Sequence, residues 1–465
     1  MGDKLTFKRL LVLLGVAAVL VGTAVALPWL RGRLRPPRAP SVLAEGFVVG
    51  EVLPVDLPPR PEGIYPPLMP EGVFDFPSLH IYSALHPFAP EREFWHDGTV
   101  AISGTAEPFL MESTPVRIRG RGASTWAYGP EKRPLRLRFA QPQRVLDSPA
   151  EATDWVLIAN LFDLTLLRNH LAFFLAGTLE GMCWAPFSRL VHVYINGEYV
   201  GVYQLADERD TSPGRASGDF LIEIDGGPAV RDAFIRRGDI EGVDFLFMNN
   251  WAISVRHPHR RERTHHMHTL RHFLTQVDTA IQSHDYARIA ALVDIPSFID
   301  YYLLQEWFKN IDISNRSIFM QIRGSADAKR LYFGPVWDFD RSSANMGSWY
   351  QPEHIFAGHY NVWFADMLQV PEIHARAATR WHEIRASQIP GMTAYAQYLI
   401  LRYAEAFHRN FEKHDHIFGG YPDWFRLISE KLRTLYGFRP QAEYLLFWLE
   451  ARAVWLDGYF SPQSP

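Results

Sequence analysis

Alternating apolar and polar residues mark the first half of the globular part of the chain. Short alternating runs at residues 79–83 and 99–103 predict strands. The strongest signal covers residues 191–205, where two β-rich runs flank Asn196-Gly197, the preferred two-residue hairpin turn. Strand signals of this kind continue to about residue 225, so we expect a sheet-rich region here.

Apolar residues at helical spacing take over beyond about residue 265. Residues 163–179 already predict one helix among the strands, capped by Asp163. Residues 267–291 and 296–309 have amphipathic spacing, and the last hundred residues predict several further helices. Strands followed by helices indicate an α+β fold with two lobes. We place the strand-rich lobe at about 74–255 and the helical lobe at about 256–460.

An uncharged apolar run, residues 10–27, precedes the globular part. A run of this length spans a bilayer as a helix, although Ala24-Val25-Ala26 also fits a signal-peptide cleavage site. We favour an uncleaved membrane anchor within residues 1–30. The basic residues on its two sides nearly balance, but a short N-terminal tail commonly stays inside, so we expect an extracytoplasmic globular part. Proline-rich residues 31–73 predict an extended spacer, with folding beginning near Phe74.

Composition and charge narrow the class of protein. The 465 residues are 47% hydrophobic and 21% charged, which is typical of a globular protein. The net charge of −4 gives no support to nucleic acid as a partner. Cys183 is the single cysteine, so the chain forms neither an internal disulfide nor a cysteine-based zinc site.

A second hairpin, residues 317–322 with 330–337, ends in Asp338 and Asp340. In an antiparallel pair the segment before the first strand lies beside the segment after the second. Asp312 and Asn315 stand in the first of these segments, so three acids and an amide are expected at one end of the hairpin. Acids gathered in this way repel one another unless a cation binds, and magnesium prefers oxygen ligands. Capping of turns is the alternative for each acid alone.

Basic residues surround a glycine-containing turn farther upstream. RIRGRGASTW (residues 117–126) leads into the turn, and KRPLRLRF (132–139) predicts a strand with Arg136 and Arg138 on one face. Glycines let backbone amides approach phosphate, and arginine forks bind its oxygens. A solvated edge strand has the same pattern, because the third glycine of a nucleotide-binding loop is missing.

These motifs occur in order with four others, and together the series resembles the CotH family, atypical kinases named for a spore coat protein. The resemblance covers about residues 75–460. It implies a two-lobed kinase-like fold, ATP and magnesium as cofactors, and protein hydroxyl groups as acceptors. The other motifs are WVLIANLFDLTLLRN (155–169), INGEYVGVYQLADERD (195–210), DIPSFIDYYLLQEWFKNIDISNRSIFM (294–320) and GPVWDFD (334–340).

The resemblance assigns roles by position. It implies Asp312 as the catalytic residue and Asp338 and Asp340 as metal ligands, to which we add Asn315 from the hairpin geometry. Glu208 is expected either to contact nucleotide or to pair with a basic residue of the neighbouring strand. The expected nucleotide-binding residues are Arg119, Gly120, Gly122, Ser124, Lys132, Arg133, Arg136 and Glu208.

Three positions depart from the family pattern. Arg136 stands where lysine is usual, Ala123 replaces an asparagine, and Arg316 occupies a place that is often a polar amide. Asp163 and Arg168 fit a structural cap and an internal salt bridge. The expected function is that of a membrane-anchored atypical protein kinase, which transfers the γ-phosphoryl group of ATP to hydroxyl side chains of an envelope or coat protein. Two alternatives stay open: a non-catalytic envelope or assembly protein, and a kinase fold that transfers AMP.

Overall fold

The protein is a mixed α+β structure, as expected from the sequence. The predicted membrane anchor lies outside the described residues, and none of the described helices is long and apolar enough to cross a membrane. The computed structural model describes residues 46–54, 56, 76–84, 91–105, 109–122, 124–129, 132–226, 245–248, 251–258, 267–325, 328–347, 350–415 and 423–461.

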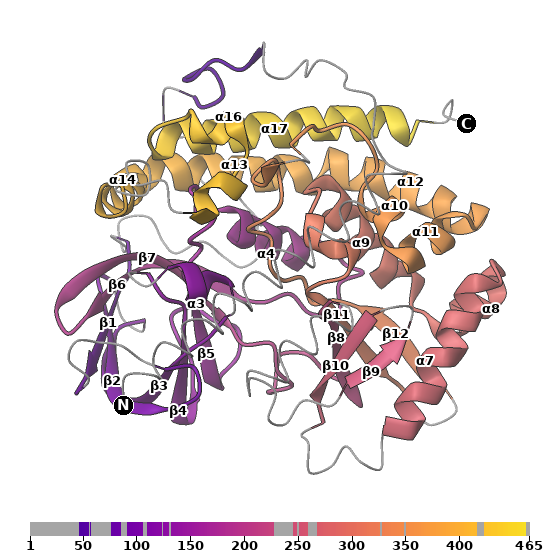
Figure 1. Ribbon diagram of the computed structural model, residues 1–465, viewed down its shortest axis with the longest axis horizontal. Coiled ribbons are helices and arrows are strands. Elements are labelled where there is room, and N and C mark those ends of the chain that lie inside the picture. Colours follow the sequence, from indigo (N-terminus) through magenta and orange to yellow (C-terminus); the bar gives the residue numbers. More distant parts are fainter. Residues whose placement is uncertain are drawn as a thin grey trace, which may run out of the picture.

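The first sheet is a closed barrel in the order β1-β2-β3-β4-β5-β7-β6 (Figure 1). Its interior is apolar, with Ile81, Ile118 and Leu157 all fully buried. The predicted hairpin is confirmed: Asn196 and Gly197 have φ of 50° and 86°, as a type I′ turn between β6 and β7 requires. The strands are β1 (Ser78–Ser83), β2 (His96–Ser103), β3 (Met111–Gly120), β4 (Leu135–Gln143), β5 (Ala152–Ile158), β6 (Ser188–Ile195) and β7 (Glu198–Asp207).

The second sheet has the order β12-β11-β8-β10-β9 and joins strands from both sides of residue 255. The hairpin predicted within the helical part therefore shares a sheet with strands of the preceding part, because β11 pairs with β8 and places Ile318 opposite Ile224. The predicted hairpin of β11 and β12 is confirmed, although β12 ends earlier than expected, where Pro335 offers no N–H. The strands are β8 (Phe220–Ile224), β9 (Phe245–Met248), β10 (Trp251–His257), β11 (Ile318–Arg323) and β12 (Arg330–Phe333).

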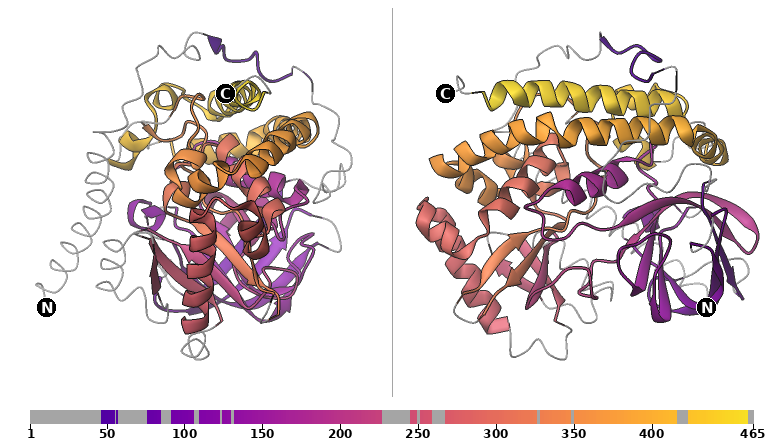
Figure 2. Two further views of the ribbon diagram at one scale, coloured as in Figure 1. Left: turned by 90° about the vertical axis from the view of Figure 1, so that its right-hand side faces the viewer. Right: turned by 180° about the vertical axis from the view of Figure 1, so that it is seen from behind.

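In Figure 1, α4 and the C-terminal helices lie above both sheets, whereas α7 and α8 flank the second sheet (Figures 1 and 2). One predicted helix, residues 267–291, is divided into α7 and α8 at His284, where φ is 52°. The longer helices are α4 (Arg168–Thr178), α7 (Met267–Gln282), α8 (Tyr286–Leu292), α9 (Ile295–Trp307), α11 (Val362–Leu368), α12 (Pro371–Ala386), α13 (Gln388–Arg402), α14 (Ala404–Lys413) and α17 (Phe438–Tyr459). The short ones are α3 (Ser124–Tyr128), η1 (Ile311–Ser314), α10 (Ala357–Tyr360), η3 (Asp423–Leu427) and α16 (Glu430–Arg433).

Part of the predicted spacer packs on the C-terminal helix. The Phe47 ring lies 5.2 Å from the ring of Tyr444 on α17, and the Gly50 N–H donates to Glu443. Leu53 is buried in the main hydrophobic core. Residues 46–54 are therefore not an extended spacer, because their apolar side chains find partners on the helical part. In Figure 2 this indigo segment runs along the outer side of α17.

Candidate metal and nucleotide site

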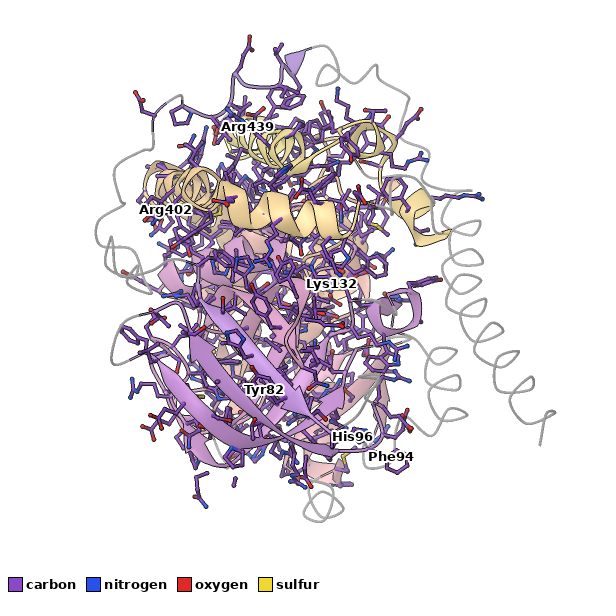
Figure 3. All side chains as sticks on the ribbon, turned by 90° about the vertical axis from the view of Figure 1, so that its left-hand side faces the viewer. Tyr82, Phe94, His96, Lys132, Arg402 and Arg439 are labelled. Carbon is purple, nitrogen blue, oxygen red and sulfur yellow. The ribbon has the colours of Figure 1, made fainter. Side chains whose placement is uncertain are left out.

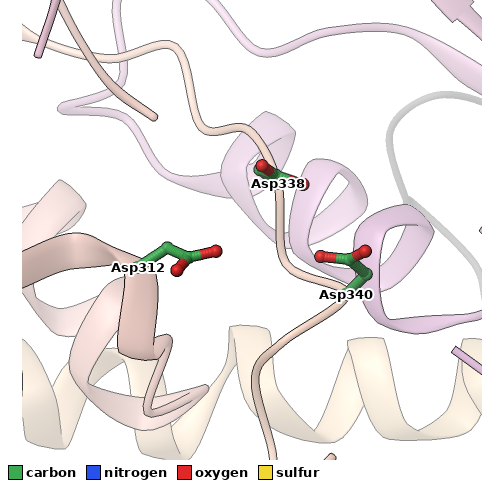
Figure 4. A group of neighbouring side chains, drawn as sticks. All are labelled: Asp312, Asp338 and Asp340. Carbon is green, nitrogen blue, oxygen red and sulfur yellow. The ribbon is translucent and has the colours of Figure 1, made fainter. Parts of the chain in front are cut away.

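Three carboxylates converge at one end of the β11–β12 hairpin. Asp312 lies in η1, and Asp338 and Asp340 follow β12. One oxygen atom of each lies within 4.8 Å of the others, and Figure 4 shows Asp312 facing the other two. The meeting of these acids, predicted from the hairpin, is thus confirmed. Clustered carboxylate oxygens are the donor set that magnesium prefers, so the residues present fit this ion.

Hydrogen bonds hold the two segments together. Asn310 accepts from the Asp312 N–H through Oδ1 and donates to the Asp338 carbonyl through Nδ2. The Ser317 hydroxyl donates to Asp338 Oδ2 at 3.1 Å. Asp338 itself has φ of 65°, a left-handed conformation that is uncommon in residues other than glycine, although aspartate and asparagine adopt it more often than most. Backbone strain of this kind persists where the surroundings impose it, often at functional sites.

Burial and mutual repulsion disfavour the charged state of the two hairpin aspartates. Burial and then the neighbouring carboxylates of Asp338 and Asp312 raise the pKa of Asp340 well above its ordinary value. Burial and Asp312 likewise raise the pKa of Asp338. A bound cation would relieve both effects, because it favours the ionised form of each acid.

A buried amide network positions the segment between Asp338 and Asp340. Asn169 Oδ1 accepts from the Phe339 N–H at 2.6 Å, and its Nδ2 donates to Asn160. The fully buried Arg168 donates to the carbonyls of Ser342 and Ser343. The first turn of α4 therefore fixes the backbone of the segment that carries Asp338 and Asp340.

The internal salt bridge predicted for Asp163 and Arg168 is confirmed, with both side chains fully buried. The predicted cap is wrong in its place, since α4 begins at Arg168 and not after Asp163. Asp163 instead accepts from the backbone N–H groups of Thr165 and Arg168 and fixes the turn that precedes the helix. Asp163 is thus a structural residue, as expected, but at a turn.

A group of charged residues, here called the Glu208 cluster, lies on the outer face of the barrel; it comprises Arg136, Asp154, Glu208 and Arg209. Arg136 Nε donates to Asp154 Oδ1 at 2.7 Å, and its Nη1 lies 3.4 Å from Glu208 Oε2. Burial raises the pKa of Glu208, but the guanidinium groups of Arg136, Arg209 and Arg121 outweigh it and hold this pKa well below its ordinary value. Of the two roles expected for Glu208, the structure shows the pairing with a basic residue.

Arg209 joins the barrel to the second sheet. Its guanidinium group lies 3.4 Å from Glu208 and 3.7 Å from Glu223 on β8. The same group stacks on Trp337, the residue before Asp338, at 4.4 Å from the ring centroid. The Glu208 cluster and the three aspartates are therefore linked through one tryptophan.

The remaining residues of the glycine turn adopt special conformations. A Cβ at Gly120 would lie 2.2 Å from the Trp126 ring, and Gly122 has φ of 82°. Ser124 is exposed at the start of α3. Arg119 Nη1 donates to the Arg92 carbonyl, and the Arg133 guanidinium stacks on Trp126 at 4.5 Å.

Two predicted site residues make other contacts. Lys132 is buried where the barrel meets the C-terminal helices (Figure 3), and its Nζ donates to Asn410 of α14 at 3.1 Å. Pro134 interrupts the strand, so Lys132 precedes β4 and does not continue its alternation with Arg136. Asn315 caps η1, and its side chain accepts a long bond from Ser314, whereas Asn310 makes the contacts between the two acidic segments. Among the described residues, the structure brings neither the Lys132 side chain nor the Asn315 side-chain amide into hydrogen-bond contact with the aspartates. Asn315 instead donates to the Asp312 carbonyl through its backbone N–H.

Sequence reasoning missed Asn310, Ser317, Arg209 and Arg341 as parts of the site. Arg341 Nη1 donates to Asp312 Oδ1, and its place directly after Asp340 was the available signal. Arg209 gave no comparable signal, because its contacts with Glu223 and Trp337 depend on how the two sheets meet.

The candidate site thus consists of three clustered carboxylates and the neighbouring Glu208 cluster, which Arg209 and Trp337 connect to them. A family model described as CotH kinase protein matches residues 116–456. The chain therefore belongs to the CotH kinase family, and the resemblance seen in the motifs is confirmed. A search of curated proteins gave no match. Membership of this family indicates a kinase-like protein.

Proposed function

We propose that this protein is an ATP- and magnesium-dependent protein kinase that phosphorylates hydroxyl side chains of an envelope or coat protein. In this proposal the barrel and the C-terminal helices are the two lobes of a kinase-like fold. The apolar run at residues 10–27 anchors the chain in a membrane, with the globular part on the extracytoplasmic side.

The observation that carries the proposal is the meeting of Asp312, Asp338 and Asp340 beside the Glu208 cluster. Mg·ATP would bring a cation to the three aspartates, and its phosphate oxygens are the kind of acceptor that arginine forks bind. The contact between Arg136 and Glu208 adds support, because a basic and an acidic side chain form a similar pair in protein kinases. Arginine at this position thus keeps the pairing that lysine would make.

The aspartates have separate roles in the proposal. Asp338 and Asp340 would hold magnesium, which when bound neutralises charge on the phosphate oxygens. Asp312 would orient the acceptor hydroxyl and take up its proton. The hydroxyl oxygen forms a bond to the γ-phosphorus, the bond from this phosphorus to the β,γ-bridging oxygen breaks, and ADP leaves with the electron pair.

Mass spectrometry of an acceptor protein tests the reaction class. The purified protein is incubated with Mg·ATP and candidate envelope or coat proteins. Phosphoryl transfer adds about 80 Da to the acceptor, whereas adenylyl transfer adds about 329 Da. The first result supports the proposal, the second replaces it with the AMP-transferring alternative, and ATP binding with no mass change favours a non-catalytic binding protein.

A further inference from the structure

Arg121 differs from the arginines of the Glu208 cluster in its partners. Arg136 and Arg209 each pair with carboxylates. Among the described residues, no carboxylate lies within ion-pair distance of the Arg121 guanidinium, although its side chain is half-buried. Charged groups withdrawn from water are usually paired, so this exception calls for an explanation.

The position of Arg121 is fixed by its neighbours. It lies between Gly120, which packs against the Trp126 ring, and Gly122, whose φ of 82° turns the chain. Its guanidinium carbon lies 5.5 Å from the ring centroid of Trp337. Arg209 contacts the same ring, so two cationic groups lie around the residue that precedes Asp338.

This arrangement is unfavourable without an anion. Burial, followed by repulsion from Arg209, lowers the pKa of Arg121 to about 10. Nearby Glu208 is already shared between Arg136 and Arg209. An incoming anion would offset both effects, and the planar fork of arginine matches two phosphate oxygens at once.

We propose that Arg121 contacts the terminal phosphoryl groups of the bound nucleotide, on the side of the site formed by Trp337 and Asp338. This inference rests on the proposed kinase function and deepens it by naming a phosphate-binding residue that is separate from the Glu208 cluster. The glycine turn holds Arg121 in place, and among the described residues its guanidinium has no carboxylate partner that would compete with the ligand.

The test compares Arg121→Gln and Arg121→Lys with the parent and with Arg117→Gln. Arg117 is exposed on β3, the strand that ends directly before Arg121, and serves as the matched control. The probes are Mg·ATP and Mg·tripolyphosphate, with binding measured by calorimetry and melting temperature. We expect Arg121→Gln to bind both probes about 10- to 100-fold more weakly, as loss of a charged hydrogen bond predicts. Lysine should restore this only in part, because it lacks the fork, and Arg117→Gln should bind like the parent.

The melting temperature without ligand separates binding from a structural role. Since Arg121 has no carboxylate partner among the residues that the structure describes, Arg121→Gln should melt at the same or a higher temperature if Arg121 serves the phosphate. A lower melting temperature together with unchanged probe binding would show a structural arginine and overturn the inference. If the parent binds Mg·ATP and Arg121→Gln binds it equally well, the inference fails while the kinase proposal stands. If the parent binds neither probe, both fail.

Discussion

Arg341 Nη1 donates to Asp312 Oδ1 over 2.7 Å, so the residue after Asp340 holds the carboxylate expected to act on the acceptor. Attraction to the Asp312 carboxylate raises the pKa of Arg341 and outweighs burial, which lowers it. Asp340 and Asp338 add to this increase. In the metal-free protein this single guanidinium offsets part of the repulsion among three acids.

Replacing Arg341 should therefore expose that repulsion. We expect Arg341→Gln to lower the free energy of unfolding by about 1.5–3 kcal/mol in metal-free buffer, in the range of hydrogen bonds to charged groups. Magnesium should then raise the melting temperature more in the variant than in the parent. The exposed Arg330→Gln on the same hairpin is the control. If magnesium raises the melting temperature equally in variant and parent, Arg341 does not offset the repulsion among the aspartates.

The raised pKa values of Asp338 and Asp340 predict how stability depends on pH. A carboxyl group whose pKa is higher in the folded state favours folding below the unfolded value of about 4, and this contribution is lost as pH rises through the folded value. The metal-free protein should melt at lower temperature as pH increases over this window. The gain from magnesium should grow over the same window, because the ion binds the ionised acids. In Asp340→Asn, the melting temperature without metal and the gain from magnesium should both change less with pH. If they change with pH as in the parent, Asp340 is not one of the titrating metal ligands.

Glu208 should make the stability of the fold depend on pH in the opposite direction. Its pKa is lowered in the folded state, so its contribution is present above the ordinary glutamate value of about 4.3 and is lost as pH falls through the lower folded value. We expect Glu208→Gln to cost about 3–5 kcal/mol at neutral pH, since buried guanidinium groups lose their partner. The gap to the parent should stay constant down to about pH 5 and narrow below it. Denaturant unfolding at several pH values measures this, with exposed Glu112→Gln as control, and a gap independent of pH would be contrary to the account.

Replacing Lys132 tests whether this lysine has a structural role or binds phosphate. Burial lowers its pKa to about 7, with Asp163 opposing, and its Nζ contacts α14. We expect Lys132→Met to bind Mg·ATP like the parent. The pKa of Lys132 in the folded state lies below its unfolded value of about 10.4, so the lysine destabilises the fold most at low pH. This effect should fade as pH rises from about 7 to 10. The amount by which Lys132→Met melts above the parent should therefore shrink over the same range. Loss of ATP binding in this variant would return Lys132 to the nucleotide site.

Contacts within one hairpin or one turn could be predicted from the sequence. The approach of Asp312 to Asp338 follows from antiparallel pairing, and the Asp163–Arg168 ion pair lies within one turn. Contacts between the two sheets could not be predicted, because Arg209 meets Glu223 only through the packing of the barrel on β8. The position of Lys132 could not be predicted either. The alternation of inward and outward side chains along β4 begins at Leu135 and does not extend back past Pro134.

In the proposed function, Asp340 serves the metal ion and Asp312 the acceptor. The most direct measurement is Mg·ATP affinity together with single-turnover phosphoryl transfer for the parent, Asp340→Asn and Asp312→Asn. We expect Asp340→Asn to weaken Mg·ATP binding and to lower transfer by about 100-fold or more. Asp312→Asn should bind Mg·ATP like the parent and lose transfer alone. If Asp340→Asn binds Mg·ATP like the parent and melts several degrees lower without magnesium, the aspartates are structural caps and the claim is contradicted.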